Sequence, residues 1–167
     1  MNMMSTKNQT AIFAAGCFWG VQFYFDEVPG VVQTEAGYTG GHTKAPTYEQ
    51  VCSHTTGHAE AVKIVFDPAI VTYETLVRQF FRMHDPTQLN RQGPDIGYSY
   101  RSAIFYGDEI QRDVAVAVRD ELNKTTFADA IVTEITSAGD WWPAEEYHQK
   151  FAEKTGRGMC HVPYAPV

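Results

Sequence analysis

Apolar residues recur along the chain with two distinct periods, and the period of two marks the strands. Residues 59–66 alternate strictly, so that Val62, Ile64 and Phe66 share one face of a predicted strand. A short apolar run at 11–15 predicts a second, buried strand. Further strands are expected at about 31–38, 100–106 and 130–136.

Helical spacing of apolar residues marks the segments between these strands. Helices are expected at about 17–28, 73–84, 108–122 and 144–154. The third begins with Asp108 and Gln111, which resemble a capping box. Its inner stripe is expected to consist of Ile110, Val114, Val118 and Leu122. The last has Pro143 at its entry and Gly156 beyond its end.

The alternation of strands and helices predicts the fold class. Helices packed on one mixed sheet give an α/β or α+β two-layer sandwich. The chain fits a single domain, 1–167, with a loose N-terminus at 1–10 and a flexible C-terminal tail at 155–167. The segment 85–99 has no period and many turn residues, and loops of that length inside a compact domain are usually functional.

Charge and hydropathy narrow the function classes. The formal net charge of −7 leaves no basic surface for nucleic acid. No apolar run approaches the roughly 18 residues of a membrane-spanning helix. The stretch "AAGC" resembles a lipoprotein cleavage site, but the apolar run before Cys17 is shorter than the roughly 7–15 residues of a signal peptide. We therefore expect a cytoplasmic protein with no membrane partner.

The cysteines form neither a metal cluster nor a dense disulfide framework. Cys17, Cys52 and Cys160 lack the short paired spacing of zinc ligands, so no metal is expected. Their odd number leaves at least one thiol unpaired, which suits a reducing compartment. Cys52 fits a core or half-buried position, whereas the glycine- and proline-rich tail would let Cys160 approach another thiol.

Cys17 is the first candidate for chemistry. It falls at the predicted junction of a strand and a helix, where unpaired N–H groups and the helix dipole favour the thiolate nucleophile. Gly16 and Gly20 leave room for a substrate to reach the sulfur. The alternative is a small buried apolar cysteine.

Glu60 is the second candidate. It lies in phase with the apolar face of the strand at 59–66, where burial would raise its pKa and keep a proton ready to donate. Alternatively, it is a solvated residue at the mouth of that strand. Three histidines offer a rival partner for the thiol, as in a cysteine hydrolase, although no protease signature surrounds them: His58, His84 and His148.

Five motifs together resemble the A-type peptide methionine sulfoxide reductases. They are "GCFWG" at 16–20, "YEQVC" at 48–52, "TGHAE" at 56–60, "HDPTQLNRQGPDIGYSYRS" at 84–102 and "PAEEYHQKF" at 143–151. The matches run in order across about residues 11–161. The resemblance implies an α/β sandwich related to the ferredoxin-like fold.

The resemblance also implies a complete site. Cys17 is expected to attack the sulfoxide sulfur, while Glu60 donates a proton to the sulfoxide oxygen. Tyr48 and Tyr100 are expected to hydrogen-bond that oxygen. Phe18 and Trp19 are expected to form an apolar pocket for the methyl group, and Asp95 is expected to position the substrate.

Recycling follows from the same resemblance. Attack leaves a sulfenic acid on Cys17, which a second thiol converts to an intramolecular disulfide. The stretch "GMCHV" resembles the tail that carries a recycling cysteine in some members, which gives that role to Cys160. Thioredoxin is the expected reductant, with dithiothreitol as a substitute. The expected substrate is methionine S-sulfoxide, free or in oxidised proteins, and the expected enzyme is a monomer without a cofactor.

Two departures from the family pattern stand out. His54 replaces a residue that is commonly small, which could alter the rim of the site, and Trp141 and Trp142 stand where Phe-Tyr is commoner. Two other function classes remain open from the residues alone. A cysteine hydrolase would turn over without a reductant, and a redox sensor or binding module would reduce no sulfoxide.

Overall fold

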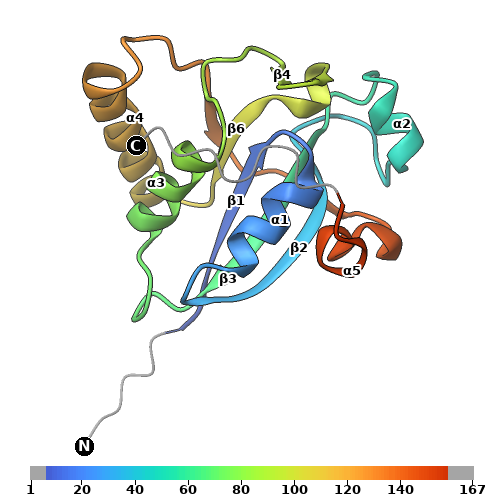
Figure 1. The fold of residues 1–167 in the computed structure, drawn as a ribbon, viewed down its shortest axis with the longest axis horizontal. Helices are drawn as coiled ribbons and strands as arrows, with labels where there is room; N and C mark the ends of the chain where they lie inside the picture. Colours follow the sequence, from blue (N-terminus) through green and yellow to red (C-terminus); the bar gives the residue numbers. More distant parts are fainter. Residues whose placement is uncertain (1–6, 158–167) are drawn as a thin grey trace, which may run out of the picture.

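Residues 7–157 are described by the computed structural model, and a mixed six-stranded sheet forms their centre (Figure 1). Its strands are β1 (Gln9–Ala15), β2 (Val31–Thr39), β3 (Ala59–Phe66), β6 (Ser102–Tyr106), β7 (Glu134–Ser137) and β8 (Trp141–Pro143). Their order across the sheet is β7-β6-β1-β3-β2-β8. A separate hairpin consists of β4 (Arg91–Gln92) and β5 (Asp95–Ile96).

The helices lie between these strands in the chain. They are α1 (Phe18–Asp26), α2 (Tyr48–Cys52), α3 (Tyr73–Met83), α4 (Glu109–Thr125) and α5 (Phe151–Thr155), together with the 3-10 turns η1 (Tyr98–Tyr100) and η2 (Glu146–His148). β6 and β7 pair in parallel across α4, while the other neighbours in the sheet are antiparallel. The predicted mixed sheet with helices packed on it is confirmed. Its relation to the ferredoxin-like fold stays a prediction.

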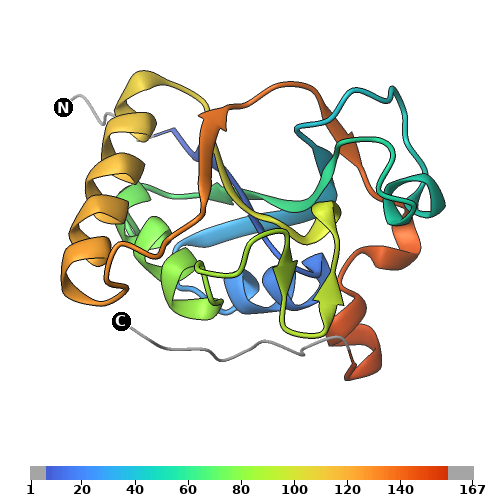
Figure 2. The same ribbon diagram turned by 90° about the horizontal axis from the view of Figure 1, so that it is seen from above.

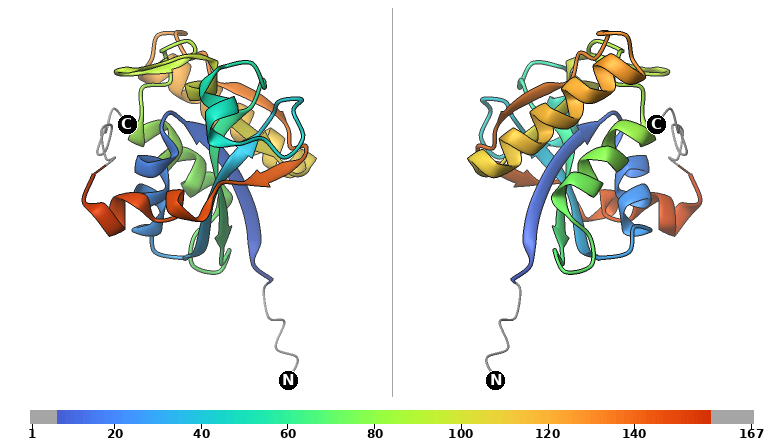
Figure 3. Two further views of the ribbon diagram at one scale, coloured as in Figure 1. Left: turned by 90° about the vertical axis from the view of Figure 1, so that its right-hand side faces the viewer. Right: turned by 90° about the vertical axis from the view of Figure 1, so that its left-hand side faces the viewer.

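The main core lies between one face of the sheet and three helices. Phe13 on β1 is fully buried with Val62 and Ile64 on β3, and α1, α3 and α4 contribute their apolar sides to the same core. The opposite face carries mostly small side chains, such as Ala14 and Ala61. Figure 3 shows α1 and α3 side by side against the sheet. The alternation of residues 59–66 is thus confirmed, because one face of β3 meets the helices and the other meets small residues.

The register of β1 brings distant segments to one end of the sheet. Because β1 is antiparallel to β3 and β6, its C-terminal end meets the N-terminal ends of both. Phe13 lies opposite Val62 and Ala15 lies opposite Ser102. The start of α1, the start of β3 and the η1 turn before β6 therefore meet at this end, together with α2 and the β4–β5 hairpin (Figures 1 and 2).

The inner stripe of α4 is shifted by one residue in its first half, where Gln111 and Ala115 are buried in place of Ile110 and Val114. Asp108 caps the helix, since its carboxylate accepts the N–H of Gln111 at 2.8 Å, but Ile110 is 75% exposed. Gln111 faces inward instead, and its amide donates to the carbonyl of Thr10 at 2.9 Å. The buried stripe accordingly runs from Gln111 through Ala115, Val118 and Leu122. A polar residue with satisfied hydrogen bonds has taken the place expected for an apolar one.

The single helix predicted over 144–154 is wrong. β8 ends at Pro143, η2 follows, and α5 begins only at Phe151. Lys150, between the two turns, has a left-handed backbone with φ of 59°.

Side-chain hydrogen bonds from the sheet hold this break in place. The Gln149 amide accepts the N–H of Ala36 and donates to its carbonyl, both at 2.9 Å. The N–H of Lys150 donates to Oε1 of the buried Gln22 at 2.8 Å. These contacts satisfy backbone groups that a continuous helix would have satisfied within itself.

Several boundaries also shift. β1 begins at Gln9, inside the segment expected to be loose, and Thr155 of the expected tail belongs to α5. Tyr100 lies in η1 rather than in the strand that follows, and β7 starts only at Glu134. Cys160 lies outside the described residues. None of the helices within residues 7–157 has the length and apolar character to span a membrane.

Replacing Gln149 tests the origin of the break. Gln149→Ala leaves the N–H of the buried Ala36 without its acceptor, so we expect a loss of about 2–3 kcal/mol in the free energy of unfolding. Urea denaturation measures it. The control is Gln33→Ala on the same strand, where the side chain is exposed and we expect a change within about 0.5 kcal/mol. Equal effects would show that Gln149 does not hold the break.

Candidate active site

Cys17 lies at the N-terminal end of α1, as predicted. It is the N-cap residue, with φ of −56° and ψ of 123°, and its carbonyl accepts the N–H of Val21 at 3.4 Å. The preceding Gly16 has φ of 92°, a left-handed conformation that glycine adopts without strain. This turn brings the half-buried thiol to the first turn of the helix, where backbone N–H groups and the helix dipole favour a thiolate.

Glu60 lies beside the same helix end and is buried. Only 1% of its surface is exposed, and its Oε1 accepts the N–H of Phe18 at 3.2 Å. Its Oε2 is buried and has no hydrogen-bond partner among the described residues. The expectation that Glu60 lies on the buried face of β3 is therefore confirmed, and the alternative of a solvated end residue is wrong.

Burial raises the pKa of Glu60 to about 8. The N–H of Phe18 acts in the opposite direction and the negative charge of Asp95 adds to the rise. The carboxyl is therefore mostly protonated near neutral pH. Because Oε1 accepts a hydrogen bond, the proton belongs on Oε2, the atom without a partner. The side chain is thus an acid whose proton is free to go to a bound group.

Two tyrosines surround this acid. The pKa of Tyr48 is raised above its ordinary value by burial and by a hydrogen bond to Cys52, and further by the charge of Glu60. The pKa of Tyr100 is raised by burial first and then by the charges of Glu60, Cys52, Asp95 and Cys17. Both phenols therefore keep their protons and act as hydrogen-bond donors at neutral pH. Glu60 acts electrostatically on both tyrosines, and Asp95 acts on Glu60 and Tyr100, so these four residues belong to one cluster, in which Cys17 acts on Tyr100.

Cys52 lies beside this cluster and is half-buried, within the range predicted for it. Its pKa is raised by burial, and the hydroxyl of Tyr48 hydrogen-bonds it from one turn earlier in α2.

Phe18 and Trp19 differ in exposure. Phe18 is completely buried, with its ring 5.7 Å from that of Tyr38 and stacked at 6.5 Å on that of Tyr48. Trp19 is half-buried and stacks on Phe151 with 3.9 Å between ring centroids. Trp19 therefore offers an accessible apolar surface, whereas Phe18 supports the pocket from beneath.

His148 fixes the indole of Trp19. Its Nδ1 accepts the Trp19 Nε1–H at 2.9 Å, and its ring packs 4.3 Å from that of Tyr48. Burial lowers the pKa of His148, so the ring is neutral. It is a packing and hydrogen-bonding residue, as its position indicated, rather than a base.

Glu145 is a site residue that the sequence reasoning missed. Its Oε2 accepts the N–H of Tyr48 at 2.9 Å, and its Oε1 accepts the hydroxyl of Tyr38 at 2.8 Å. Burial alone would raise its pKa, but the hydrogen bonds from Tyr48 and Tyr38 outweigh that effect and lower it. The charged carboxylate therefore joins α2 to β2. Its only signal in the sequence was its place in "PAEEYHQKF", where no pattern distinguishes it from Glu146.

The chain is similar to known proteins of one family. A family model described as "Peptide methionine sulfoxide reductase" matches residues 9–167. The chain belongs to this family. A relative in Geobacter sulfurreducens, named "Peptide methionine sulfoxide reductase MsrA", is 55% identical over 157 residues, which cover 93% of this chain and 97% of that protein. The relative of the same name in Methanothermobacter thermautotrophicus is 50% identical over 96% of this chain and 95% of its own length.

Solved structures agree with this assignment. Methionine sulfoxide reductase A of Corynebacterium diphtheriae is 35% identical, with a TM-score of 0.81 over 96% of this chain and 80% of that one. Mxr1 of Saccharomyces cerevisiae in its reduced form is 28% identical, with a TM-score of 0.89 over 99% of this chain and 95% of that one. The resemblance read from the five motifs is confirmed, and the family's α/β fold with it.

The other histidines of this family member hold backbone segments. His58 accepts the N–H of Gly41 at 3.0 Å and contacts the carbonyl of Thr43 at 2.6 Å. The ring nitrogens of the buried His84 hydrogen-bond the carbonyl of Phe80 and the hydroxyl of Ser102. These bonds engage both rings with loop and core groups, in place of the hydrolase role considered for them.

The two departures from the family pattern lie at different distances from the chemistry. His54 has a left-handed φ of 61°, lies against Gly97 and meets the ring of Tyr100 edge-on at 6.2 Å, so it belongs to the rim of the site. Trp141 lies on the edge strand β8. Its ring packs over Gly37 of the neighbouring strand β2, and its indole N–H donates to the Glu35 carboxylate at 2.6 Å. The tryptophans thus alter sheet-edge packing.

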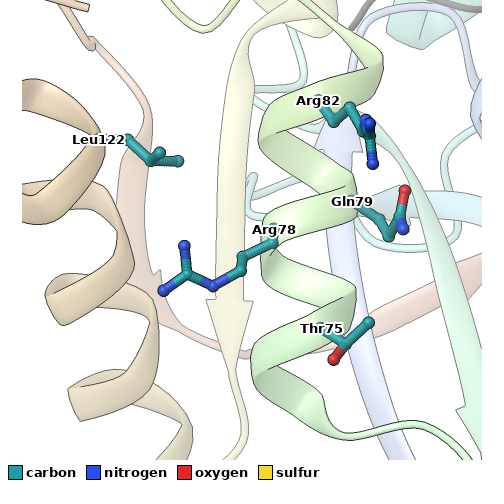
Figure 4. A pocket seen from close by; sticks show the side chains of 5 residues that line it. All are labelled: Thr75, Arg78, Gln79, Arg82 and Leu122. Carbon is teal, nitrogen blue, oxygen red and sulfur yellow. The ribbon is translucent and has the colours of Figure 1, made fainter. Parts of the chain in front are cut away.

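A cavity of about 250 Å³ between α3 and α4 contains none of these site residues (Figure 4). Arg78, on its wall, is held by Glu121 at 2.8 Å and Glu74 at 3.1 Å. Within residues 7–157 no group of three or more His, Cys, Asp or Glu side chains is placed to hold a metal ion.

The raised pKa of Glu60 predicts a pH-dependent stability. The folded protein keeps this proton up to about pH 8, whereas the unfolded chain releases it near 4.5. The contribution of Glu60 to stability is therefore greatest below pH 4.5 and is lost as pH rises from 4.5 through 8. Urea denaturation between pH 4.5 and 8.5 should show a steeper decline for the wild type than for Glu60→Gln. The exposed Glu153→Gln is the control and should follow the wild type. Parallel curves for the wild type and Glu60→Gln would contradict the assignment.

Proposed function

We propose that this member of the family reduces methionine S-sulfoxide, with Cys17 as the nucleophile and Glu60 as the acid. One observation carries the proposal above the others. The Oε2 of Glu60 is a buried, protonated oxygen that has no hydrogen-bond partner within residues 7–157, and it lies at the helix end that carries the thiol. Reduction of a sulfoxide needs a nucleophile at sulfur and a proton on a poor leaving oxygen, and this pair supplies both.

In the chemical step the Cys17 sulfur attacks the sulfoxide sulfur while Glu60 protonates the oxygen. The attack forms a bond between the two sulfur atoms. Transfer of the protonated oxygen to the Cys17 sulfur then breaks both this bond and the S–O bond of the substrate, and Cys17 carries the oxygen as a hydroxyl. The substrate sulfur gains two electrons and becomes methionine, and the cysteine sulfur loses two and becomes a sulfenic acid. The phenols of Tyr48 and Tyr100 donate hydrogen bonds to the oxygen as its charge grows.

Recognition of the substrate falls to the remaining site residues. We assign the S-methyl group to the accessible face of Trp19, with Phe18 supporting the pocket beneath it. Asp95 positions the substrate from the β4–β5 hairpin. The stacking of Trp19 on Phe151 and its hydrogen bond to His148 support this assignment, because they hold the indole in one orientation.

Recycling needs a second thiol and an external reductant. In our proposal Cys160 attacks the sulfenic acid, which releases water and leaves a Cys17–Cys160 disulfide. Thioredoxin then reduces this disulfide by exchange, and dithiothreitol replaces thioredoxin in vitro. The proposal needs no cofactor, because the thiols supply the electrons. It places a monomer in the cytoplasm, which suits an odd number of cysteines.

Replacement of the nucleophile tests the function directly. Cys17→Ser should lose methionine sulfoxide reduction with dithiothreitol by a factor of at least about 10³, because a serine hydroxyl is a far weaker nucleophile than a thiolate. Methionine formed from the S and R sulfoxides is measured separately, and activity is expected with S alone. Cys52→Ala is the matched thiol control and should keep activity within about tenfold. Turnover by a folded Cys17→Ser protein would remove the mechanism.

The proposed role of Cys160 predicts a split between reductants. Cys160→Ser should complete one reduction and accumulate a sulfenic acid on Cys17, since the disulfide cannot form. Thioredoxin-driven turnover should fall about tenfold or more, while dithiothreitol restores much of the rate. Mass spectrometry after one substrate equivalent should find a Cys17–Cys160 peptide in the wild type. Its absence, with unchanged thioredoxin kinetics in the variant, would make Cys160 a spectator.

Glu145 is expected to act through Tyr48. Glu145→Gln cannot accept both hydrogen bonds, so α2 loses its anchor and the single-turnover rate should fall about tenfold. In a Tyr48→Phe background the same change should cost less than about twofold, because the phenol that Glu145 positions is gone. The adjacent exposed Glu146→Gln is the control. Equal losses in both backgrounds would reduce Glu145 to a general structural role.

A further inference from the structure

A groove next to the catalytic cluster exposes apolar side chains from three separate segments. Leu89 precedes β4, Tyr98 begins η1 and Val132 precedes β7, and their exposed fractions are 66%, 42% and 39%. They line one depression of about 260 Å³, hereafter the η1 groove. Ile96, on the adjoining β5, is also 63% exposed. Large apolar side chains that converge from distant parts of a chain without being buried mark an interaction site more often than scattered single ones do.

The walls of the η1 groove are fixed by hydrogen bonds. The guanidinium of the buried Arg101 lies 4.0 Å from the ring centroid of Tyr98 and donates to the Tyr98 carbonyl at 3.1 Å. It also pairs with Glu134 at 3.4 Å. The N–H of Val132 donates to the carbonyl of Pro86 at 2.8 Å, which ties the two sides of the groove together. A ligand would therefore meet a surface that is already ordered, so little conformational entropy is lost on binding.

The η1 turn separates the groove from the catalytic cluster. Tyr98 lines the groove and Tyr100 belongs to the cluster, and both lie on one turn of 3-10 helix. With three residues per turn, their side chains leave the axis about 120° apart and only about 4 Å apart along it. An extended polypeptide advances roughly 3.3–3.6 Å per residue. A chain held in the catalytic pocket therefore needs only a few residues to cross η1 and reach the groove.

The chemistry of the groove indicates one occupant. The volume is below the roughly 300–1,000 Å³ of pockets for drug-sized ligands, which suits one or two side chains. Arg101 and Glu134 neutralise each other, and the other polar lining residues, Gln88, Asn90 and Ser102, are uncharged. The groove therefore favours an uncharged side chain, and its exposed Leu89, Tyr98 and Val132 favour an apolar one. Resting on the proposed function, we propose that the η1 groove binds an apolar side chain of the substrate polypeptide, a few residues from the methionine sulfoxide.

A peptide scan tests this on the unmodified protein. A single leucine is moved from one to five residues on either side of methionine S-sulfoxide in a Gly/Ser peptide, and kcat/KM is compared with that of N-acetylmethionine S-sulfoxide. At one or two positions leucine should raise kcat/KM about tenfold over the Gly/Ser peptide, as partial burial of one leucine side chain provides. An equal kcat/KM at every position would overturn the proposal. Failure to reduce the small substrate would instead refute the proposed function.

Two variants then test whether the leucine side chain binds in the η1 groove. Leu89→Ser and Val132→Ser should each remove most of the leucine advantage while leaving kcat/KM for the small substrate within about twofold. Ile110→Ser, which alters an exposed apolar residue on α4 that does not line the groove, should retain the advantage. Survival of the advantage in both groove variants would place the leucine elsewhere and refute the assignment. A raised KM for thioredoxin with unchanged peptide kinetics would assign the groove to the reductant and also overturn it.

Discussion

The burial of the Glu60 carboxyl against the first turn of α1 is the constraint on which the site depends. Its Oε1 takes the N–H of Phe18, one of the backbone donors that a helix end leaves unsatisfied. This single hydrogen bond joins the acid to the helix that carries the thiol. It also decides which oxygen holds the proton, since Oε2 of this carboxyl has no partner in the part of the chain that the structure describes. Burial disfavours the charged form of the carboxyl, and this raises the pKa of Glu60.

The sheet register makes this placement possible. β1 lies between β3 and β6 and runs antiparallel to both, so the end of β1 meets the beginnings of its two neighbours. Cys17 follows β1, Glu60 is the second residue of β3, and Tyr100 comes just before β6. Tyr48 is not on these strands, and it needs the carboxylate of Glu145 to hold α2 in reach. The nucleophile and the acid therefore depend on strand pairing, while one of the two phenols depends on a separate polar anchor.

The sequence predicted those parts of the site that follow from local periodicity. The alternation of 59–66 was enough to place Glu60 on the buried face of β3, and the apolar run ending at Gly16 was enough to place Cys17 at a helix start. The break between η2 and α5 could not be predicted from local periodicity. Gln22 and Gln149 impose it through hydrogen bonds between residues more than a hundred positions apart in the sequence. Ile110 was misplaced because Gln111 could satisfy its amide in the interior. The grouping of Tyr48, Tyr100 and Asp95 came only from the family resemblance, since no spacing rule relates them.

The two proposed reacting groups must be in opposite protonation states at the same pH. Attack at sulfur needs a thiolate, whereas protonation of the oxygen needs a neutral carboxyl. In water a carboxylic acid with a pKa near 4.5 would have lost its proton long before a thiol ionised. Burial raises the pKa of the Glu60 carboxyl to about 8, so it keeps its proton around neutral pH, while a helix N-terminus favours the thiolate form of a cysteine. Phe18, whose N–H bonds the Glu60 carboxyl, is completely buried and stacks on Tyr48, so aromatic packing forms part of the buried structure around the proposed acid.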